Sequence, residues 1–338
     1  MKAAVLHAPH DVRFEDRPDP RIEQPTDVIL RLAASCVCGS DLWPYRGAQP
    51  VERATPMGHE YCGIVEEVGS DVKTVKRGQF VIGAFAFSDN TCANCQAGYQ
   101  SGCLHGGFFN TAQAPFLRVP LADGTLVPTT GNPSAGMIPA MLTLSDVMGT
   151  GWFAADAASV GPGKTAVVVG DGAVGLLGVL SAKVMGAERI IVFSRHETRQ
   201  ALARRYGATD IVTERGEEGI ARVMELTRGI GADSVLECVG TQQSMSQAIG
   251  SARRGGYVSY VGVPHGVSFD GRELFFTHVH LHGGPAPVRR YLPKLIRLVE
   301  EGRMDPGGVF DLTLPLAQVA EGYRAMDERR AIKTLLQT

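Results

Sequence analysis

Residues 165–184, TAVVVGDGAVGLLGVLSAKV, contain the clearest indication of fold in this sequence. A short β-branched run typical of a buried strand ends at Gly170, and an apolar segment of helical length follows. Gly170, Gly172 and Gly175 stand at the junction with the spacing G-x-G-x-x-G. In such a strand-turn-helix, the first glycine makes the turn, the second lets a pyrophosphate approach the backbone, and the third lets the helix pack closely. The helix N-terminus favours negative charge, so the stretch predicts a dinucleotide site.

From residue 148 onward, short apolar runs alternate with segments of helical length. This alternation is typical of a Rossmann domain with a doubly wound parallel sheet. The six predicted strands are residues 165–170, 189–194, 209–212, 233–240, 256–262 and 274–283. We therefore expect an α/β fold with this domain at residues 148–285.

The residues before 148 have a different pattern. They are rich in glycine, proline and short β-branched runs, such as 27–34, 62–69 and 78–87, and they predict a β-rich, partly open barrel. The last fifty or so residues contain two helical segments and a closing strand, which we expect to pack back onto this barrel. The first domain is then discontinuous, at residues 1–147 and 286–338.

The end of the second Rossmann strand indicates which dinucleotide binds. An NAD-selective site usually has an acid there, about 20 residues after the glycine motif, which binds the ribose 2′-hydroxyl. This chain has Ser194 and Arg195 at that point, with His196 and Arg199 nearby. A hydroxyl and a guanidinium bind a 2′-phosphate through charge-assisted hydrogen bonds, so the sequence predicts NADP(H) over NAD(H). The alternative is that Arg195 faces solvent and takes no part. The predicted cofactor-binding residues are Gly170, Gly172, Ala173, Val174, Gly175, Ser194, Arg195, His196 and Arg199.

The composition limits the class of partner. The 338 residues carry a formal net charge of −2, which predicts neither a nucleic-acid partner nor a membrane partner. The N-terminus lacks the apolar core of a signal peptide, and no apolar run reaches the roughly 20 residues of a membrane span. Seven cysteines in such a chain are more often reduced thiols or metal ligands than disulfides. We expect a cytoplasmic protein.

Three fragments of the first domain carry donors that suit Zn²⁺. They are SCVCGSDLW (35–43), MGHEYCG (57–63) and LTLSDVMGTG (142–151). The donors are Cys38, His59, Glu60 and Asp146. Together with the glycine motif, these fragments resemble the zinc-dependent alcohol dehydrogenases of the medium-chain dehydrogenase/reductase superfamily, and the resemblance runs from end to end. It implies that the β-rich domain is a GroES-like catalytic domain.

The resemblance also implies a ligand set. Cys38, His59 and Asp146 would bind a catalytic zinc and leave one position for water or substrate. Glu60 would lie beside the ion as an exchanging fourth ligand. The thiolate and the aspartate together would neutralise the two charges of the ion.

Further roles follow from the same resemblance. Asp41 would orient the ligand His59, Ser40 would pass the substrate proton outward, and Thr150 would contact the cofactor. Zinc in such enzymes polarises a carbonyl oxygen or lowers the pKa of a bound alcohol, and the nicotinamide takes or gives the hydride.

The chain departs from the family two residues after Asp41. Members often have a proton-relay histidine there, whereas this chain has Trp43, which leaves the outer part of the relay open. An aromatic pocket wall would favour hydrophobic or aromatic aldehydes and ketones, although such residues can equally be ordinary core. The candidates for the pocket wall are Trp43, Tyr45, Phe85 and Phe87.

The stretch SDNTCANCQAGYQSGC, residues 88–103, carries a second group of possible ligands. Relatives with a structural zinc have four ligands spaced x₂, x₂ and x₇, and Asp89, Cys92, Cys95 and Cys103 match that spacing with an aspartate in the first place. A redox Cys-x-x-Cys normally lies at a helix N-terminus beside a strand, and a disulfide would leave a third thiol over. A structural zinc is the favoured interpretation.

The sequence therefore predicts a zinc-dependent, NADP(H)-linked alcohol dehydrogenase or carbonyl reductase with a small-molecule alcohol, aldehyde or ketone as substrate. The alternatives are an NAD(H)-dependent polyol or amino-alcohol dehydrogenase of the same architecture and a non-catalytic NADPH-binding protein. A homo-oligomer is expected, since oligomers are usual among the enzymes that the chain resembles, and both a dimer and a tetramer are compatible with the sequence.

Overall fold

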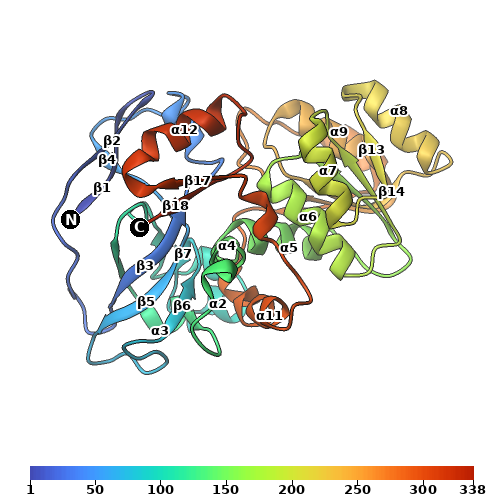
Figure 1. Cartoon of the computed structure of the whole chain (residues 1–338). Coiled ribbons are helices and arrows are strands. Elements are labelled where there is room, and N and C mark those ends of the chain that lie inside the picture. The colour runs from blue at the N-terminus through green and yellow to red at the C-terminus, as the bar shows by residue number, and fades with distance from the viewer. The chain divides into compact units, whose positions relative to one another are not determined.

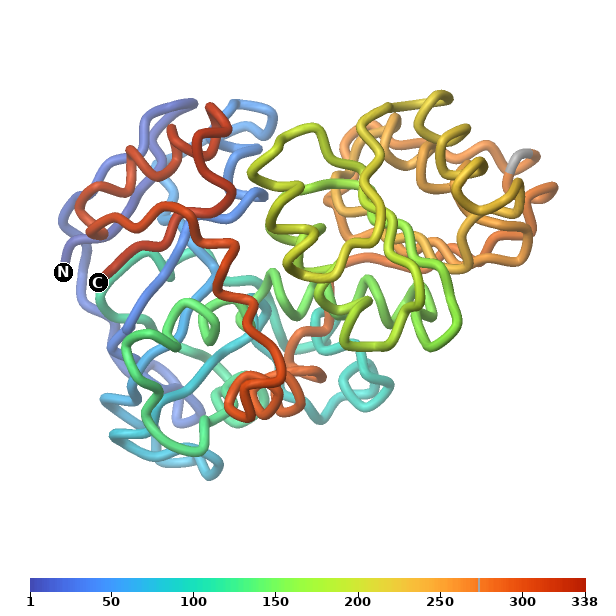
Figure 2. The backbone as a smooth tube through the Cα atoms, turned by 45° about the vertical axis from the view of Figure 1, so that its right-hand side comes forward, coloured from blue at the N-terminus to red at the C-terminus, as the bar shows by residue number. Residues whose placement is uncertain are grey.

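The computed structural model describes residues 1–338, apart from the side chain of Glu273. The chain forms two compact units (Figure 1). The first contains Met1–Gly149 and Pro287–Thr338, and the second contains Thr150–Ala286. The sequence predicts boundaries after residues 147 and 285, and the units divide after Gly149 and Ala286. Both chain ends lie in the first unit (Figures 1 and 2).

The second unit is built on a six-stranded sheet with the order β13-β12-β11-β14-β15-β16, and its neighbouring strands are parallel. This is the order of a Rossmann fold, in which a ligand binds where the strand order reverses, here beside β11. The strands are β11 (Thr165–Val169), β12 (Arg189–Phe193), β13 (Asp210–Val212), β14 (Ala232–Glu237), β15 (Ala252–Tyr260) and β16 (His280–Gly283).

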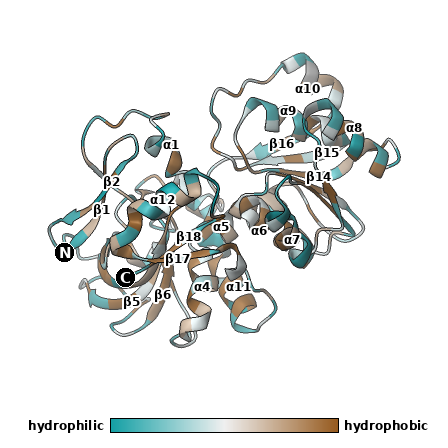
Figure 3. Ribbon diagram, turned by 45° about the horizontal axis from the view of Figure 1, so that its top comes forward, coloured by the Kyte–Doolittle hydropathy of each residue, from teal (hydrophilic) through white to brown (hydrophobic). Residues whose placement is uncertain are grey.

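Helices connect these strands and cover the sheet. Their apolar sides pack on a core of buried valine, isoleucine, leucine and phenylalanine side chains from the strands. Such continuous apolar strands are expected where both faces of a parallel sheet are covered. The outer helix α7 is largely hydrophilic (Figure 3). The helices are α6 (Ala173–Val184), α7 (Glu197–Tyr206), α8 (Gly216–Leu226), α9 (Gln242–Ser251) and α10 (Gly271–Thr277).

The prediction of a strand over residues 274–283 is wrong for its first part. Residues Gly271–Thr277 form α10, and only His280–Gly283 continue as β16. The reason is a helix start signal: the Asp270 carboxylate accepts the backbone N–H of Arg272, as an N-cap aspartate does. The apolar run over 274–283 by itself predicts a strand, but an acid just before such a run is also a helix start signal.

The first unit contains a seven-stranded sheet with the order β10-β6-β5-β3-β18-β17, in which β9 also pairs with β3. Strand β18 comes from the last residues of the chain and lies antiparallel to β3, with Leu335 opposite Cys36. The C-terminal segment thus completes the sheet of the first unit (Figure 1). The strands are β3 (Val28–Cys36), β5 (Tyr61–Val68), β6 (Phe80–Gly83), β9 (Phe116–Val119), β10 (Leu126–Pro128), β17 (Leu312–Pro315) and β18 (Thr334–Gln337).

Two smaller sheets and several helices surround this sheet. The three-stranded sheet consists of β1 (Lys2–Ala8), β2 (Asp11–Asp16) and β4 (Thr55–Pro56), and the two-stranded sheet consists of β7 (Ala86–Phe87) and β8 (Gly107–Phe108). The helices are α1 (Leu42–Tyr45), α2 (Ala93–Gln96), α3 (Ala122–Thr125), α4 (Ile138–Thr143), α11 (Val288–Glu300) and α12 (Val319–Asp327), and α5 (Val147–Ala157) begins at the end of this unit. Short 3₁₀ helices are η1 (Gln100–Gly102), η2 (Ala135–Met137), η3 (Gly307–Val309) and η4 (Leu316–Gln318). Within the described residues, the structure contains no helix of the length and apolar character that crossing a membrane requires.

Candidate active site and metal centres

The pairing of β3 with β5 brings the first two predicted zinc ligands together. The strands are antiparallel, with Ser35 opposite Tyr61. Cys38 follows β3 and His59 precedes β5, so both residues emerge at the same end of the sheet. Residues 21 positions apart in the sequence therefore become neighbours through strand register.

Asp146 is brought to the same place by the residue before it. The Ser145 hydroxyl donates to the carbonyl oxygen of Gly83 at 2.7 Å and accepts the backbone N–H of Tyr61 at 3.0 Å. Ser145 thus ties the start of α5 to β5 and β6. This anchor fixes the backbone on which the Asp146 carboxylate stands.

The donor atoms of Cys38, His59, Glu60 and Asp146 lie within 4.8 Å of one another. Cys38 Sγ is 3.6 Å from Asp146 Oδ2, and His59 Nε2 is 3.2 Å from the same oxygen. Ligands at usual zinc bond lengths around a tetrahedral ion are about 3.5 Å apart for sulfur and oxygen and about 3.3 Å apart for nitrogen and oxygen. These separations and the donor types fit a zinc ion. We call these four residues the catalytic cluster, after the role that the sequence resemblance implies for them.

The acidic groups around the catalytic cluster also favour the binding of a cation. Burial raises the pKa of the Cys38 thiol, and the negative charge of Glu60 raises it further. Burial alone would lower the pKa of His59, but the carboxylate of Asp41 and the sulfur of Cys38 outweigh it and hold that pKa well above its usual value. The surroundings of His59 are therefore rich in acidic groups, and a divalent ion held here would neutralise them and favour the thiolate form of Cys38.

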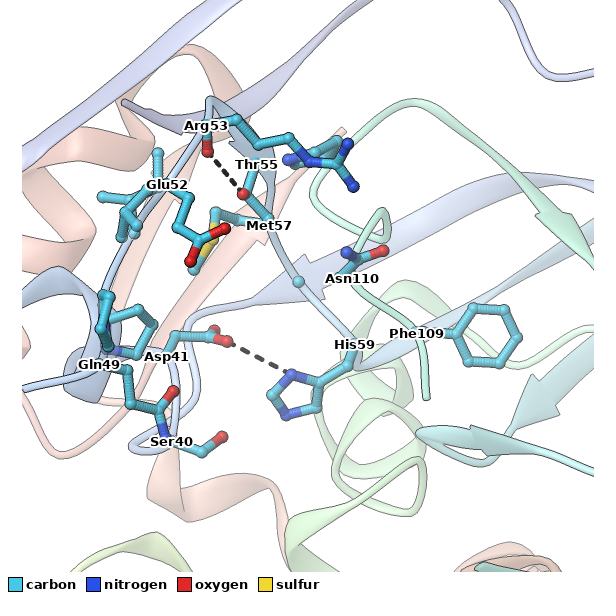
Figure 4. Close-up of a pocket in the computed structure, with 16 residues that line it drawn as sticks. Ser40, Asp41, Gln49, Glu52, Arg53, Thr55, Met57, His59, Phe109 and Asn110 are labelled. Carbon is cyan, nitrogen blue, oxygen red and sulfur yellow. Dashed lines mark hydrogen bonds and ion pairs between the residues drawn. The ribbon is translucent and has the colours of Figure 1, made fainter. Parts of the chain in front are cut away.

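Asp41 holds the other side of the His59 ring (Figure 4). Its Oδ1 lies 3.3 Å from His59 Nδ1, and its Oδ2 accepts the backbone N–H of Cys38 at 3.0 Å. The Gln113 side chain donates to the carbonyl oxygen of Cys36 and accepts the Tyr323 hydroxyl. The Gln113 amide also lies 3.4 Å from the Asp41 carboxylate. Asp41 thus orients His59 so that Nε2 faces the cluster.

Lys333 is a member of this region that sequence reasoning missed. Its ammonium group donates to Glu60 Oε1 at 2.6 Å and to the carbonyl oxygen of Val37, and both charged side chains are 1% exposed. Burial favours the neutral lysine, but electrostatic interactions with the neighbouring Cys36 and Glu60 side chains outweigh it and raise the pKa of Lys333 well above its usual value. The other Glu60 oxygen, Oε2, is buried and has no hydrogen-bond partner. A lysine inside the apolar closing segment AIKTLL was the available signal.

A cavity of about 430 Å³ opens beside Ser40, Asp41 and His59. In Figure 4 the Ser40 side chain lies near the His59 ring. The cavity has both apolar and polar walls. Its lining residues are Leu6, Ser40, Asp41, Pro44, Gln49, Pro50, Val51, Glu52, Arg53, Thr55, Pro56, Met57, Gly58, His59, Phe109 and Asn110.

The four aromatic residues predicted to wall a pocket have different surroundings. Tyr45 belongs to one hydrophobic core cluster and Phe87 packs against another. Trp43 is half-buried in α1. The Phe85 ring lies edge-on to the His59 ring, with the centroids 6.3 Å apart, and is stacked on the Phe108 ring at 5.9 Å.

The residues between β7 and β8 form the second cluster. The donor atoms of Asp89, Cys92, Cys95 and Cys103 lie within 4.8 Å of one another, and we call these four residues the lobe cluster. The sulfur atoms of Cys92 and Cys103 are 3.8 Å apart, which matches the separation of about 3.8 Å for two thiolates on a tetrahedral zinc. The donor set therefore fits a structural zinc.

We call the segment 89–105 the lobe. Hydrogen bonds within it lower the pKa of two of these donors, Cys92 and Asp89. Hydrogen bonds from the amides of Leu104 and Cys95 lower the pKa of Cys92 to about 7. Burial would raise the pKa of Asp89, but the amide of Cys92 and the side chain of His105 hold it well below its usual value. His105 Nδ1 is 2.5 Å from Asp89 Oδ2, so His105 orients Asp89. Sequence reasoning passed over His105 because it lies outside the ligand spacing.

The glycine loop of the second unit fits a dinucleotide. Gly170 has a φ of +115°, which disfavours other residues, and a Cβ atom on Gly175 would stand 2.0 Å from the Gly170 carbonyl oxygen. A Cβ atom on Gly172 would meet nothing within 4 Å. Gly172 begins α6 without a side-chain cap, so the N–H groups of Ala173 and Val174 in the first turn are available to an anion.

Positively charged side chains gather at the end of β12. Arg195 is exposed and donates to the carbonyl oxygen of Thr213, as does Arg215 at the start of α8. Burial lowers the pKa of Arg215, and the charge of Arg195 lowers it further, so the two guanidinium groups are near each other. Arg199 on α7 is paired with Asp171 of the glycine loop. Sequence reasoning missed Arg215 and Asp171.

The remaining predicted cofactor residues are Ser194, His196 and Thr150. The Ser194 side chain is buried and donates to the Asp171 carboxylate at 2.7 Å. His196 is exposed at the N-cap of α7. Thr150 is buried in α5, next to Gly151, whose backbone packs tightly on the first turns of α6.

Known proteins resemble both halves of the chain. A family model described as an alcohol dehydrogenase GroES-like domain matches residues 24–129, and one described as a zinc-binding dehydrogenase matches residues 173–301. A probable zinc-binding alcohol dehydrogenase of Mycobacterium tuberculosis is 36% identical over 331 residues, or 96% of this chain and 84% of the relative. Zinc-type alcohol dehydrogenase B of Aspergillus flavus is 32% identical, over 99% of this chain and 81% of the relative.

A solved structure agrees with these relatives. The alcohol dehydrogenase TADH from Thermus sp. ATN1 has a TM-score of 0.92 and 31% identity, over 100% of this chain and 99% of that one. The Rossmann strand order and the catalytic cluster define the class as a medium-chain dehydrogenase/reductase with a GroES-like domain. Within that class, the chain belongs to the zinc-dependent alcohol dehydrogenases. The predicted fold and family are therefore confirmed, and with them the requirement for zinc and a nicotinamide cofactor.

Proposed function

We propose that this alcohol dehydrogenase transfers a hydride between NADP(H) and an alcohol, aldehyde or ketone. The observation that carries the choice of NADP(H) is the group of arginines at the end of β12. Arg195 donates to the carbonyl oxygen of Thr213, and Arg215 donates to the carbonyl oxygens of Thr213 and Glu214. A 2′-phosphate offers them more acceptor oxygens and two negative charges.

The residues of the first unit would perform the chemistry around the substrate oxygen. Zinc held by the catalytic cluster supplies Lewis-acid polarisation of that oxygen. Asp41 keeps the His59 ring oriented through Nδ1. The Ser40 hydroxyl lines the cavity beside His59, where it can donate a proton to the oxygen in reduction and accept one in oxidation.

The cavity lining favours a substrate that carries polar groups besides the reacting one. Gln49, Glu52, Arg53 and Asn110 offer charged and hydrogen-bonding side chains. Tyr45 and Phe87, which would have made an aromatic wall, are part of the core or pack against it. The cavity therefore also offers partners to polar alcohols and hydroxy ketones, and this observation supports a polyol or amino alcohol as the second candidate substrate.

Three further statements complete the proposal. The lobe cluster binds a second, structural zinc. The enzyme is a homo-oligomer, either a dimer or a tetramer. It acts in the cytoplasm. The last two stay predictions from the sequence.

The test measures initial rates of NADPH and NADH oxidation with aliphatic, aromatic and hydroxylated carbonyl compounds. Wild type should turn over a subset and prefer NADPH. Arg195→Asp should reduce the NADPH-to-NADH ratio of kcat/KM tenfold or more, since it places a carboxylate where the phosphate binds. Arg254→Asp near the amino end of β15 is the matched control and should leave the ratio unchanged. An unchanged ratio in Arg195→Asp contradicts the assignment.

A further inference from the structure

Asp171 occupies an unusual position in the glycine loop. It stands between Gly170 and Gly172, yet its carboxylate reaches the end of the neighbouring strand β12. Oδ2 accepts the Ser194 hydroxyl at 2.7 Å, and Oδ1 lies 3.2 Å from Arg199 Nη1. The sequence predicts that Ser194 and Arg199 bind the cofactor, and it gives Asp171 no role.

The contacts of Asp171 are well protected from water. The side chains of Asp171 and Arg199 are 14% and 15% exposed, and Ser194 is fully buried. An ion pair of this kind is screened less by salt than a surface pair. The Asp171 carboxylate therefore competes with other acceptors for the Ser194 hydroxyl and the Arg199 guanidinium.

A 2′-phosphate needs these two donors. A phosphate at the end of β12 would accept from Ser194 and Arg199, and the carboxylate already there would repel it. NAD(H) has a 2′-hydroxyl in place of the phosphate and does not need these two donors. In NAD-selective sites, an acid at this end of the sheet binds that hydroxyl. Asp171 reaches that place from the first strand instead of the second.

Two neighbouring arginines supply positive charge for a phosphate in addition to that of Arg199. Arg195 and Arg215 lie outside the Asp171 pair and bond to the Thr213 carbonyl. With Arg199, three guanidinium groups lie at this end of the sheet. The balance still favours a phosphate, but less strongly than it would without the acid.

We propose that Asp171 determines cofactor specificity: it competes with the 2′-phosphate for Ser194 and Arg199, and so allows the enzyme to accept NAD(H) as well as NADP(H). The inference rests on the proposed function only in placing the 2′-phosphate at the end of β12. With NAD(H), the Asp171–Arg199 pair stays intact and the carboxylate accepts the ribose hydroxyl. With NADP(H), the phosphate displaces the carboxylate from both donors.

The experiment measures dissociation constants of NADPH and NADH for the purified enzyme by titration of nicotinamide fluorescence. Asp171→Asn keeps the shape and removes the charge. Its Kd for NADPH should fall at least tenfold, as expected when a like charge within hydrogen-bond distance of the phosphate is removed. Its Kd for NADH should stay the same or rise. Asp171→Ser provides a second variant, and thermal unfolding checks that each is folded.

The control is Glu188→Gln, which removes one charge just before β12, roughly 20 Å from Ser194 at the usual rise of a strand. It should leave both constants unchanged. A Kd for NADPH that is unchanged or larger in Asp171→Asn and Asp171→Ser overturns the inference. If both nucleotides bind but Arg195→Asp leaves the ratio of their dissociation constants unchanged, the phosphate does not bind at the end of β12. The proposed function and this inference are then both wrong.

Discussion

The catalytic cluster and the lobe cluster each offer four donors, but the chain assembles them differently. Cys38, His59, Glu60 and Asp146 come from three separate segments that only the sheet of the first unit brings together. The lobe cluster comes from one short stretch, residues 89–103. The first cluster therefore depends on the tertiary fold, whereas the second depends on local turns.

The electrostatics of the two clusters differ in the same way. Burial raises the pKa of Cys38, whereas backbone amides lower the pKa of Cys92 to about 7. The lobe backbone thus favours one thiolate, that of Cys92, while burial raises the pKa of Cys95 as it does that of Cys38. An ion bound in either cluster would hold the buried thiols as thiolates. The lobe cluster is therefore assembled within one segment, whereas the catalytic cluster is buried and depends on the fold of the first unit.

The largest expected effect separates the two clusters by activity. Cys38→Ala should lower kcat/KM by about three orders of magnitude or more, since a zinc Lewis acid contributes several kcal/mol and each 1.4 kcal/mol is tenfold. Cys95→Ala should lower the unfolding temperature but change the initial rate of freshly purified enzyme less than tenfold. Metal analysis should find two zinc ions per chain in wild type and one in each variant.

Either of two results would break the comparison. Full zinc content in Cys38→Ala would show that the catalytic cluster is not the zinc site. A single zinc per chain in wild type would show that the lobe cluster is not a zinc site, and the lobe would then be a thiol-rich loop.

The sequence predicts the lobe ligands and the glycine loop because both are local. The spacing from Asp89 to Cys103 is set by turns within one segment, and the motif from Gly170 to Gly175 is one strand-turn-helix. The catalytic ligands follow from resemblance, since no local pattern states that Asp146 meets Cys38. The structure supplies the reason, which is the β3–β5 register and the Ser145 anchor.

Other members of the site could not be predicted from local patterns. Lys333 and Glu60 are 273 positions apart and meet only because β18 pairs with β3. In the sequence, Asp171 occupies an x position of the glycine motif. Only the structure shows that its carboxylate reaches the end of β12. The sequence does not tell whether the aromatic residues near Trp43 belong to the core or line a pocket, because both use the same side chains. Tertiary packing decides the matter for Tyr45, which belongs to the core.

The second effect concerns the stability of the catalytic cluster. Lys333→Met leaves the buried Glu60 carboxylate without its cation, and breaking a buried pair in this way typically costs about 3–5 kcal/mol. Urea unfolding should show that loss. Lys333→Arg keeps the charge and should lose much less. If Lys333→Met is as stable as wild type, Glu60 is neutral in the folded protein and the pair is not ionic.

The smallest effect tests how the lobe cluster is supported. Groups that hold a metal ligand usually contribute 10–100-fold to metal affinity, and His105 holds Asp89. His105→Ala should therefore weaken zinc binding by the lobe about tenfold, as measured by competition with a chromogenic chelator. His7→Ala removes a similar histidine–carboxylate pair, with Glu15, elsewhere in the first unit and should leave zinc affinity unchanged. Asp89→Ala should weaken binding more than His105→Ala, because it removes the ligand itself. Equal zinc affinity in His105→Ala and wild type would show that the backbone amides alone hold Asp89, and the lobe would then be even more self-contained than the comparison with the catalytic cluster requires.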